Sequence, residues 1–155
     1  MIKSVIMNKM RSVILTLFAI AFIAFAFHKV SVQRGDEPWT QNQLLEPADL
    51  AKVLTDANSP QPTIYSIGPM PIIKNSIDIG SAGEKDNLKK LEQDLDKLSK
   101  DTNIVIYCGC CAFNKCPNIR PAFTLLNEMG FKNHKLLNMP HNVKVDWIDH
   151  GYPVN

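Results

Sequence analysis

Residues 103–116 read Asn103-Ile104-Val105-Ile106-Tyr107-Cys108-Gly109-Cys110-Cys111-Ala112-Phe113-Asn114-Lys115-Cys116, an apolar run followed at once by a group of cysteines. The run 103–107 is almost wholly apolar and predicts a strand in the middle of a sheet that is covered on both faces. All four cysteines of the chain lie within these last nine residues, so they do not link distant parts of the fold to one another. The group therefore predicts a chemical site at the end of a buried strand.

Apolar periodicity on both sides of this stretch predicts alternating helices and strands. Helices are expected at 47–56, at 84–100, between the cysteine loop and Gly130, and at 143–150, and further strands at 63–67, 76–79 and 134–138. Such alternation with short connections predicts an α/β fold with parallel strands joined by right-handed crossovers. Sites in such sheets form at the carboxyl ends of the strands, which is where the cysteine group begins.

The first 27 residues have the layout of a secretory signal peptide. Lys3, Lys9 and Arg11 precede an uncharged apolar run at 13–27, and Ala24-Phe25-Ala26 provides the small-x-small pattern that signal peptidase accepts. An uncleaved membrane anchor is the alternative, because tilting or bilayer thinning tolerates spans of about 17 residues. Either alternative predicts an exported chain that is periplasmic, or anchored and facing the periplasm or exterior, with membrane contact only through an uncleaved N-terminal segment.

Residues 28–45 are polar with little apolar periodicity, and they predict a linker between the leader at 1–27 and one domain at 46–155. All fifteen acidic residues but only fourteen of the seventeen lysines and arginines lie beyond residue 26, so the net charge without the leader is 14 − 15 = −1. This balance argues against a nucleic-acid partner, which needs a clustered basic face. No nucleotide-binding loop is present, and no cofactor is expected.

Four short pieces of the chain form an ordered series. They are the strand that ends in Cys108, Arg120-Pro121-Ala122 opening a helix, Met129-Gly130-Phe131 closing it, and Trp147-Ile148-Asp149-His150-Gly151-Tyr152-Pro153-Val154 at the end. In this order and spacing they resemble the rhodanese-like sulfurtransferase family, over about 45–154. The resemblance implies a rhodanese-like parallel sheet flanked by helices. It also implies transfer of sulfane sulfur, with Cys108 as the nucleophile that carries a persulfide and Arg120 near the anionic donor.

The chain departs from that family in its active-site region. Cys108 and Arg120 are twelve positions apart, so the loop is enlarged relative to the family's loop. The family's acidic residue in the first core strand would fall near Tyr65 or Ser66, and its following arginine would fall at Gly68 or Pro69, where this chain has no charge. These departures affect the expected catalytic residues more than the expected fold.

A thiolate located where a strand runs into a helix faces backbone N–H groups and the positive end of the helix dipole, which lower its pKa. It can then take a sulfur atom from thiosulfate or a persulfide and hold it covalently. Cys116 lies just before the helix and competes for this role, and we favour Cys108 because the strand end is the better-defined position. Cys110 and Cys111 are expected to be relay or resolving thiols. The expected partners are a small sulfur-donor anion and a thiol acceptor.

Three alternatives remain open for the cysteine group. The first is a thiol–disulfide redox relay, and the second is a pair of local disulfides that rigidify the loop. The third is a metal site for copper or zinc, whose ligands would be Cys108, Cys110, Cys111 and Cys116. Their spacing differs from the two separated knuckles that zinc fingers use.

Four further residues have simpler expectations. Asn118 is expected to cap the following helix, and Trp147 to pack in the core. Tyr107 should point to the strand face opposite Cys108. His141 follows the last strand and could face the cysteine loop, although a lone histidine is more often a surface or packing residue.

Overall fold

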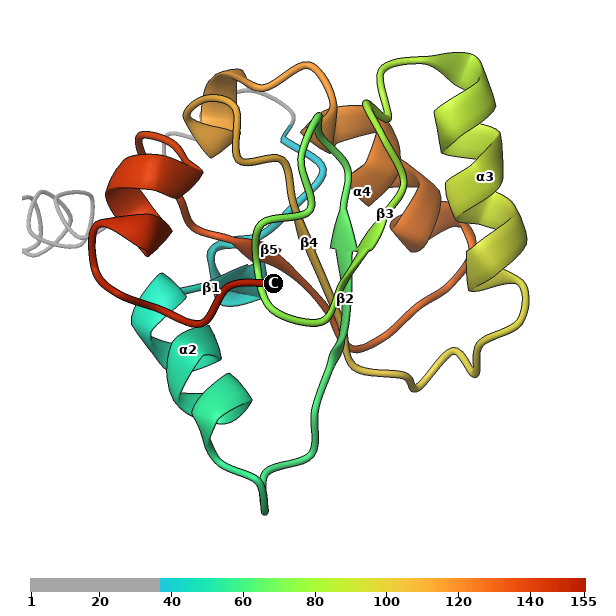
Figure 1. Cartoon of the computed structure of the whole chain (residues 1–155). Helices are drawn as coiled ribbons and strands as arrows, with labels where there is room; N and C mark the ends of the chain where they lie inside the picture. The colour runs from blue at the N-terminus through green and yellow to red at the C-terminus, as the bar shows by residue number, and fades with distance from the viewer. Residues whose placement is uncertain (1–36) are drawn as a thin grey trace, which may run out of the picture. The chain divides into compact units, whose positions relative to one another are not determined.

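The computed structural model describes residues 37–155, which form one unit around a five-stranded sheet (Figure 1). Its strands are β1 (Leu44–Leu45), β2 (Thr63–Ser66), β3 (Ser76–Asp78), β4 (Ile104–Tyr107) and β5 (His134–Leu137). They lie in the order β1-β5-β4-β2-β3, and every neighbouring pair is parallel. The expected α/β fold with a parallel sheet flanked by helices is confirmed.

Helices cover both faces of this sheet. They are α2 (Pro47–Thr55), α3 (Lys85–Leu95) and α4 (Ile119–Glu128), with short helical turns η1 (Gln41–Gln43), η2 (Phe113–Lys115) and η3 (Lys144–Ile148). Leu91 of α3 and Phe123 of α4 belong to one buried cluster, and Leu50 of α2 and Trp147 of η3 belong to the other. Each face of the sheet therefore has its own apolar core, as a parallel sheet requires.

The central strand β4 is buried along its whole length. Ile106 and Cys108 contribute to the core beneath α3 and α4, whereas Val105 and Tyr107 contribute to the core beneath α2 and η3. Tyr107 thus points away from Cys108, as predicted, and its hydroxyl accepts a hydrogen bond from the Ile73 backbone N–H at 3.1 Å. The alternation of the strand delivers the Cys108 sulfur to the α3 and α4 side.

Two elements differ from the sequence prediction. Helix α3 ends at Leu95 rather than near Lys100, because the chain continues in tight turns in which the Leu98 N–H donates to the Leu95 carbonyl. These turns keep Leu98 against the core, so the apolar spacing persists after the helix has stopped. Strand β1 was not predicted, because a strand of two residues carries no alternation.

The predicted leader at 1–27 and residues 28–36 of the predicted linker lie outside the described residues. Within 37–155, no helix combines the length and the apolar character that crossing a membrane requires.

Candidate thiol site

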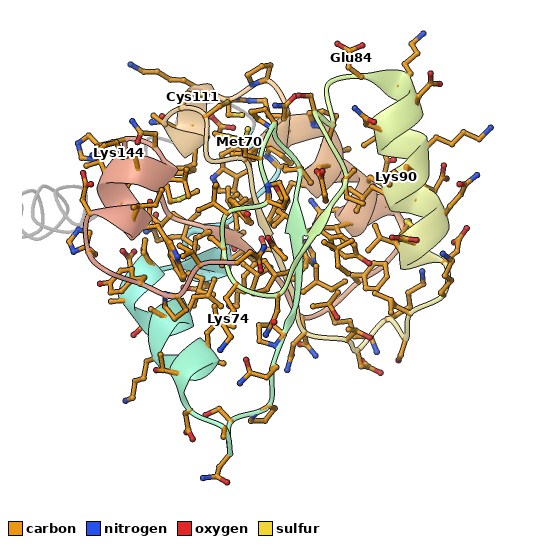
Figure 2. All side chains as sticks on the ribbon, in the orientation of Figure 1. Met70, Lys74, Glu84, Lys90, Cys111 and Lys144 are labelled. Carbon is orange, nitrogen blue, oxygen red and sulfur yellow. The ribbon has the colours of Figure 1, made fainter. Side chains whose placement is uncertain are left out.

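The cysteine loop connects β4 to α4 at the carboxyl-terminal edge of the sheet. Cys108 follows β4 directly, Gly109 has a φ of 83°, and Cys116 follows η2. Figure 2 shows Cys111 at the end of the sheet where β4 finishes, on the same side as Met70, which follows β2. All four cysteines belong to the described part of the chain, and all four are free thiols in this structure.

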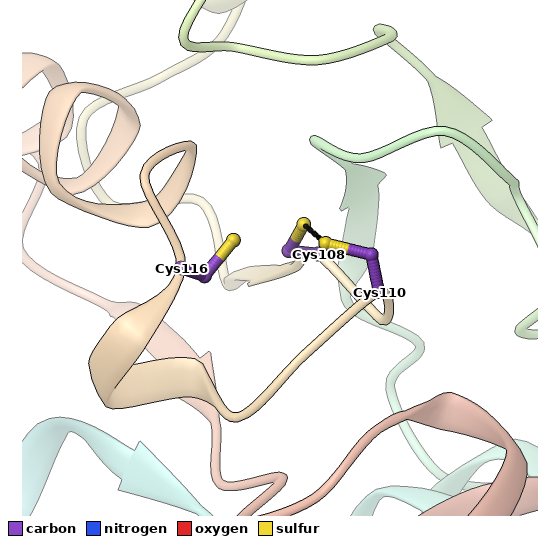
Figure 3. A group of neighbouring side chains, drawn as sticks. All are labelled: Cys108, Cys110 and Cys116. Carbon is purple, nitrogen blue, oxygen red and sulfur yellow. Dashed lines mark hydrogen bonds between the residues drawn. The ribbon is translucent and has the colours of Figure 1, made fainter.

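The sulfur atoms form one group, and Figure 3 shows those of Cys108, Cys110 and Cys116 near one another, with an interaction marked between Cys108 and Cys110. Cys108 Sγ lies 3.2 Å from Cys110 Sγ, and Cys110 Sγ lies 3.4 Å from Cys111 Sγ. The Sγ atoms of Cys108, Cys110 and Cys116 all lie within 4.8 Å of one another. Cys108 and Cys116 are buried, whereas Cys110 is exposed and Cys111 is half-buried. The structure therefore brings all four predicted thiols into one site.

Asn118 organises the buried side of this site. Its Nδ2 donates to Cys108 Sγ at 3.3 Å, while its Oδ1 accepts the backbone N–H of Gly83 at 2.9 Å. Asn118 is the N-cap residue of α4, as predicted, but its side chain makes no capping hydrogen bond to the helix. An amide that donates to sulfur favours the thiolate, because a hydrogen bond to the charged form lowers a pKa.

Two glycines allow backbone segments after β2 and before α3 to lie close to Cys108 and Asn118. A Cβ on Gly68 would lie 2.7 Å from Cys108 Sγ, and a Cβ on Gly83 would lie 2.9 Å from Asn118 Oδ1. Gly68 follows β2, and Gly83 precedes α3, so the site is built from three segments. Neither the role of these glycines nor the contact of Asn118 with sulfur was predicted from the sequence. The available signal was a glycine just after a buried strand, which often marks a close backbone approach.

The surroundings give the three clustered thiols different pKa values. The pKa of Cys108 falls from 9.0 to about 5, chiefly because the Cys116 thiol can donate to its sulfur, and further donation from Asn118 and Cys110 adds to this effect against burial. Cys110 Sγ and Asn118 Nδ2 lie 3.2 Å and 3.3 Å from Cys108 Sγ, so these two contacts support the lower pKa, and Cys116 Sγ lies within 4.8 Å. The neighbouring Cys108 sulfur raises the pKa of Cys116, and burial raises the pKa of Cys110 to about 12. The site thus favours one thiolate, at Cys108, among protonated thiols.

This thiolate should make the stability of the fold depend on pH. Because the pKa of Cys108 is lower in the folded chain than in the unfolded chain, the unfolded chain binds more protons between about 5 and 9.0. The contribution of Cys108 to the free energy of unfolding is complete above pH 9.0 and is lost as the pH falls toward about 5. We expect the urea midpoint of the wild type to fall more steeply over this range than that of Cys108→Ser. If the urea midpoints of the two proteins change equally with pH, that result would contradict a Cys108 thiolate.

Gly68→Ala is expected to disturb this site through its backbone. The new Cβ would lie 2.2 Å from the Cys108 carbonyl oxygen, a contact that no side-chain rotation relieves. We expect a loss of about 1–3 kcal/mol in the free energy of unfolding, measured by chemical denaturation, and a changed Cys108 titration. The matched control is Gly151→Ala, where nothing lies within 4 Å of the new Cβ. Gly151→Ala should lower the free energy of unfolding by about 1–2 kcal/mol, because alanine disfavours the left-handed backbone at this position. It should leave the titration of Cys108 unchanged.

Arg120 has partners outside the group of sulfur atoms. Its Nη2 donates to the Glu37 carboxylate at 2.5 Å and to the Asn114 carbonyl at 2.9 Å, and its guanidinium lies 5.6 Å from the centre of the Trp39 ring. Among residues 37–155, no hydrogen bond or ion pair joins it to a cysteine. In this structure Arg120 therefore fastens the segment 37–39 to the end of the cysteine loop, rather than extending toward Cys108.

Comparisons with known proteins leave the family open. A scan against protein-family models finds no match to the chain, and a search of curated proteins finds none either. The parallel five-stranded sheet flanked by helices, together with the group of Cys108, Cys110 and Cys116, is compatible with a rhodanese-like fold. The fold and site define an α/β protein with a partly buried thiol cluster at the carboxyl edge of its sheet.

Proposed function

We propose that the chain is an exported, rhodanese-like sulfurtransferase that holds sulfane sulfur as a persulfide on Cys108. The observation that carries the proposal is the unbroken run of sulfur contacts from Cys108, only 1% exposed, through Cys110 to Cys111. A soluble donor would reach a buried thiolate only slowly, because little of the sulfur is exposed. A neighbouring exposed thiol provides a route for sulfur by successive exchange.

Each exchange step balances without an added oxidant. A thiolate attacks the outer sulfur of a donor such as thiosulfate, a new S–S bond forms, the S–S bond of the donor breaks, and sulfite leaves with the electron pair. The same exchange between neighbouring cysteines then moves the outer sulfur inward or outward. The low pKa of Cys108 makes it a good leaving group, so a persulfide on Cys108 can pass its outer sulfur to a thiol acceptor.

The chemistry defines the partners of this proposal. They are a small anionic sulfur donor or a persulfide, and a thiol acceptor, and neither a cofactor nor a nucleic acid is needed. Export through the N-terminal segment belongs to the same proposal and is tested separately. The chain is located in cell fractions, and the mass of its N-terminal peptide shows whether the leader has been cleaved.

The test is intact mass spectrometry of the full chain, purified without reductant or chelator. Spectra are recorded under native and denaturing conditions, before and after incubation with thiosulfate. A gain of one sulfur atom that cyanide removes supports the proposal. No gain, with hydrogens missing from the denatured mass, would support disulfides and a redox relay instead.

The same sulfur positions also suit a soft metal ion, which is the alternative outcome of this test. Zinc–thiolate bonds are about 2.3 Å long, so three thiolates around one ion lie about 4 Å apart. The Sγ atoms of Cys108, Cys110 and Cys116, all within 4.8 Å of one another, approach that arrangement. A metal-sized excess of mass, present only in the native spectrum, would overturn the sulfurtransferase proposal.

A further inference from the structure

Residues 37–40, which we call the strap, lie against the cysteine loop and the helix that follows it. Figure 1 draws this segment in cyan where it leads into β1. The Trp39 ring lies 6.0 Å from the ring of Phe113, the first residue of η2, and 5.8 Å from the ring of Phe123 in α4. The strap therefore contacts both α4 and the turn that immediately precedes Cys116.

Arg120 joins the strap to the same turn by a second route. Its Nη2 donates to the Glu37 carboxylate and also to the carbonyl oxygen of Asn114 in η2. The turn in turn positions Cys116, whose N–H donates to the Phe113 carbonyl at 3.4 Å and whose side chain is fully buried. Burial of this thiol thus depends on the place that η2 takes under the strap.

The strap is held less firmly than the sheet. The side chains of Arg120 and Glu37 are 42% and 28% exposed, so solvent weakens their ion pair. Among residues 37–155, the buried Glu37 Oε2 atom finds no hydrogen-bond partner, which adds a desolvation cost to the seated position. Residues 37–40 also belong to no helix or strand. Segments of this kind open locally at a lower free energy than the core of a fold.

We propose that the strap is a releasable lid that controls access to the buried thiols of Cys108 and Cys116. When the strap leaves, the Phe113 ring loses its contact with the strap, and η2 can move away from the thiols. The opening stays local, because the Phe113 N–H still donates to the Met139 carbonyl at 3.0 Å. Access to the thiols needs no sulfur chemistry, whereas a role of the strap in loading Cys108 rests on the proposed function.

The test measures alkylation of each cysteine by iodoacetamide in the full chain, with the modified sites mapped by mass spectrometry. Trp39→Ala should raise the Cys116 rate by about tenfold, because it removes two aromatic contacts of the strap. Glu37→Gln should raise the same rate by about two- to fivefold, as expected for loss of a partly exposed ion pair. Added salt should raise the wild-type rate more than that of Glu37→Gln, because salt screens this pair.

Two control variants separate release of the strap from a general loss of stability. Tyr152→Ala removes a half-buried aromatic ring on the other face of the sheet, where it packs 5.2 Å from the Trp147 ring. Glu128→Gln removes an exposed carboxylate from the last residue of α4. Both controls should leave the Cys116 rate unchanged.

Hydrogen exchange gives a second measurement that does not depend on thiol chemistry. In Trp39→Ala, the amides of residues 113–116 should exchange faster, while those of β4 should exchange as in the wild type. Glu37→Gln keeps the aromatic contacts, so its result remains decisive if Trp39→Ala is unstable. Unchanged alkylation and exchange in Glu37→Gln and Trp39→Ala would overturn the inference. An equal rise of the Cys116 rate in Tyr152→Ala would also overturn it.

Sulfur loading distinguishes this inference from the proposed function. If both are correct, Trp39→Ala should gain sulfur from thiosulfate faster than the wild type does. If the wild type gains no sulfur while Trp39→Ala still speeds alkylation of Cys116, the proposed function fails and the strap remains a lid. If the wild type loads sulfur normally while alkylation and exchange do not change in the variants, only the role of the strap fails.

Discussion

Replacing Cys108 with serine is expected to abolish the gain of sulfur from thiosulfate. A hydroxyl group cannot hold the persulfide, and it is far too weak an acid to form the attacking anion. The fold should persist, because serine is close in size to cysteine and Asn118 Nδ2, now 3.3 Å from the sulfur, can still donate to the new oxygen. The measurement is the intact mass before and after thiosulfate, with cyanide release as confirmation.

The chain supplies its own matched controls for this substitution. Cys110→Ser and Cys111→Ser remove thiols nearer the surface, and they should slow sulfur loading without abolishing it. Full loading in Cys108→Ser would show that another thiol holds the sulfur, with Cys116 as the next to be replaced. Equal loss from all four substitutions would favour a metal or cluster site.

Asn118→Asp is expected to raise the pKa of Cys108 by at least about one unit from its value of about 5, which is a tenfold change in the thiol–thiolate equilibrium constant. The substitution replaces the amide that donates to Cys108 Sγ with a carboxylate in a nearly buried position. Two negative charges in contact raise the pKa of both groups. The hydrogen bond from the Gly83 N–H can remain, because a carboxylate also accepts. The titration of ultraviolet thiolate absorbance measures the effect, and the rate of sulfur loading should fall at weakly acidic pH, where the thiolate population changes most.

Asn114→Asp is the control for charge alone. It adds the same charge at an exposed position in the same loop, where solvent and salt screen it. Its titration should resemble that of the wild type. If Asn118→Asp also leaves the titration unchanged, then the amide does not stabilise the thiolate, and the sulfur environment described above is wrong.

The sheet and its flanking helices could be predicted from local patterns in the sequence. The run Ile104–Tyr107 predicted the central strand because both faces of that strand are buried, which removes polar residues from it. The edge strand β1 could not be predicted, because it is specified by pairing of Leu44 with Leu136, far along the chain, rather than by a pattern of its own. Local periodicity reports burial, and it does not report which strands become neighbours.

The same distinction applies to the site. The cysteines are close in sequence, so the sequence alone could predict that they form one group. The partners of Asn118 and Arg120 could not be predicted in the same way, because Gly83 and Glu37 lie 35 and 83 positions away from them. Asn118 resembled a helix cap because asparagine is common in that position, and the folded chain directs its side chain to sulfur instead.

The closeness of the cysteines in sequence has a consequence for folding. Their thiols can meet in the unfolded chain, because short loops close within about 10–100 ns, long before a parallel sheet forms. Burial of Cys108 and Cys116 depends on the completed fold, in which Gly68 and Gly83 cover the site. A chain that meets an oxidant before it folds would therefore form local disulfides, whereas a chain that folds first would shield two of its four thiols. The order of folding and oxidation thus determines which form of the protein is produced.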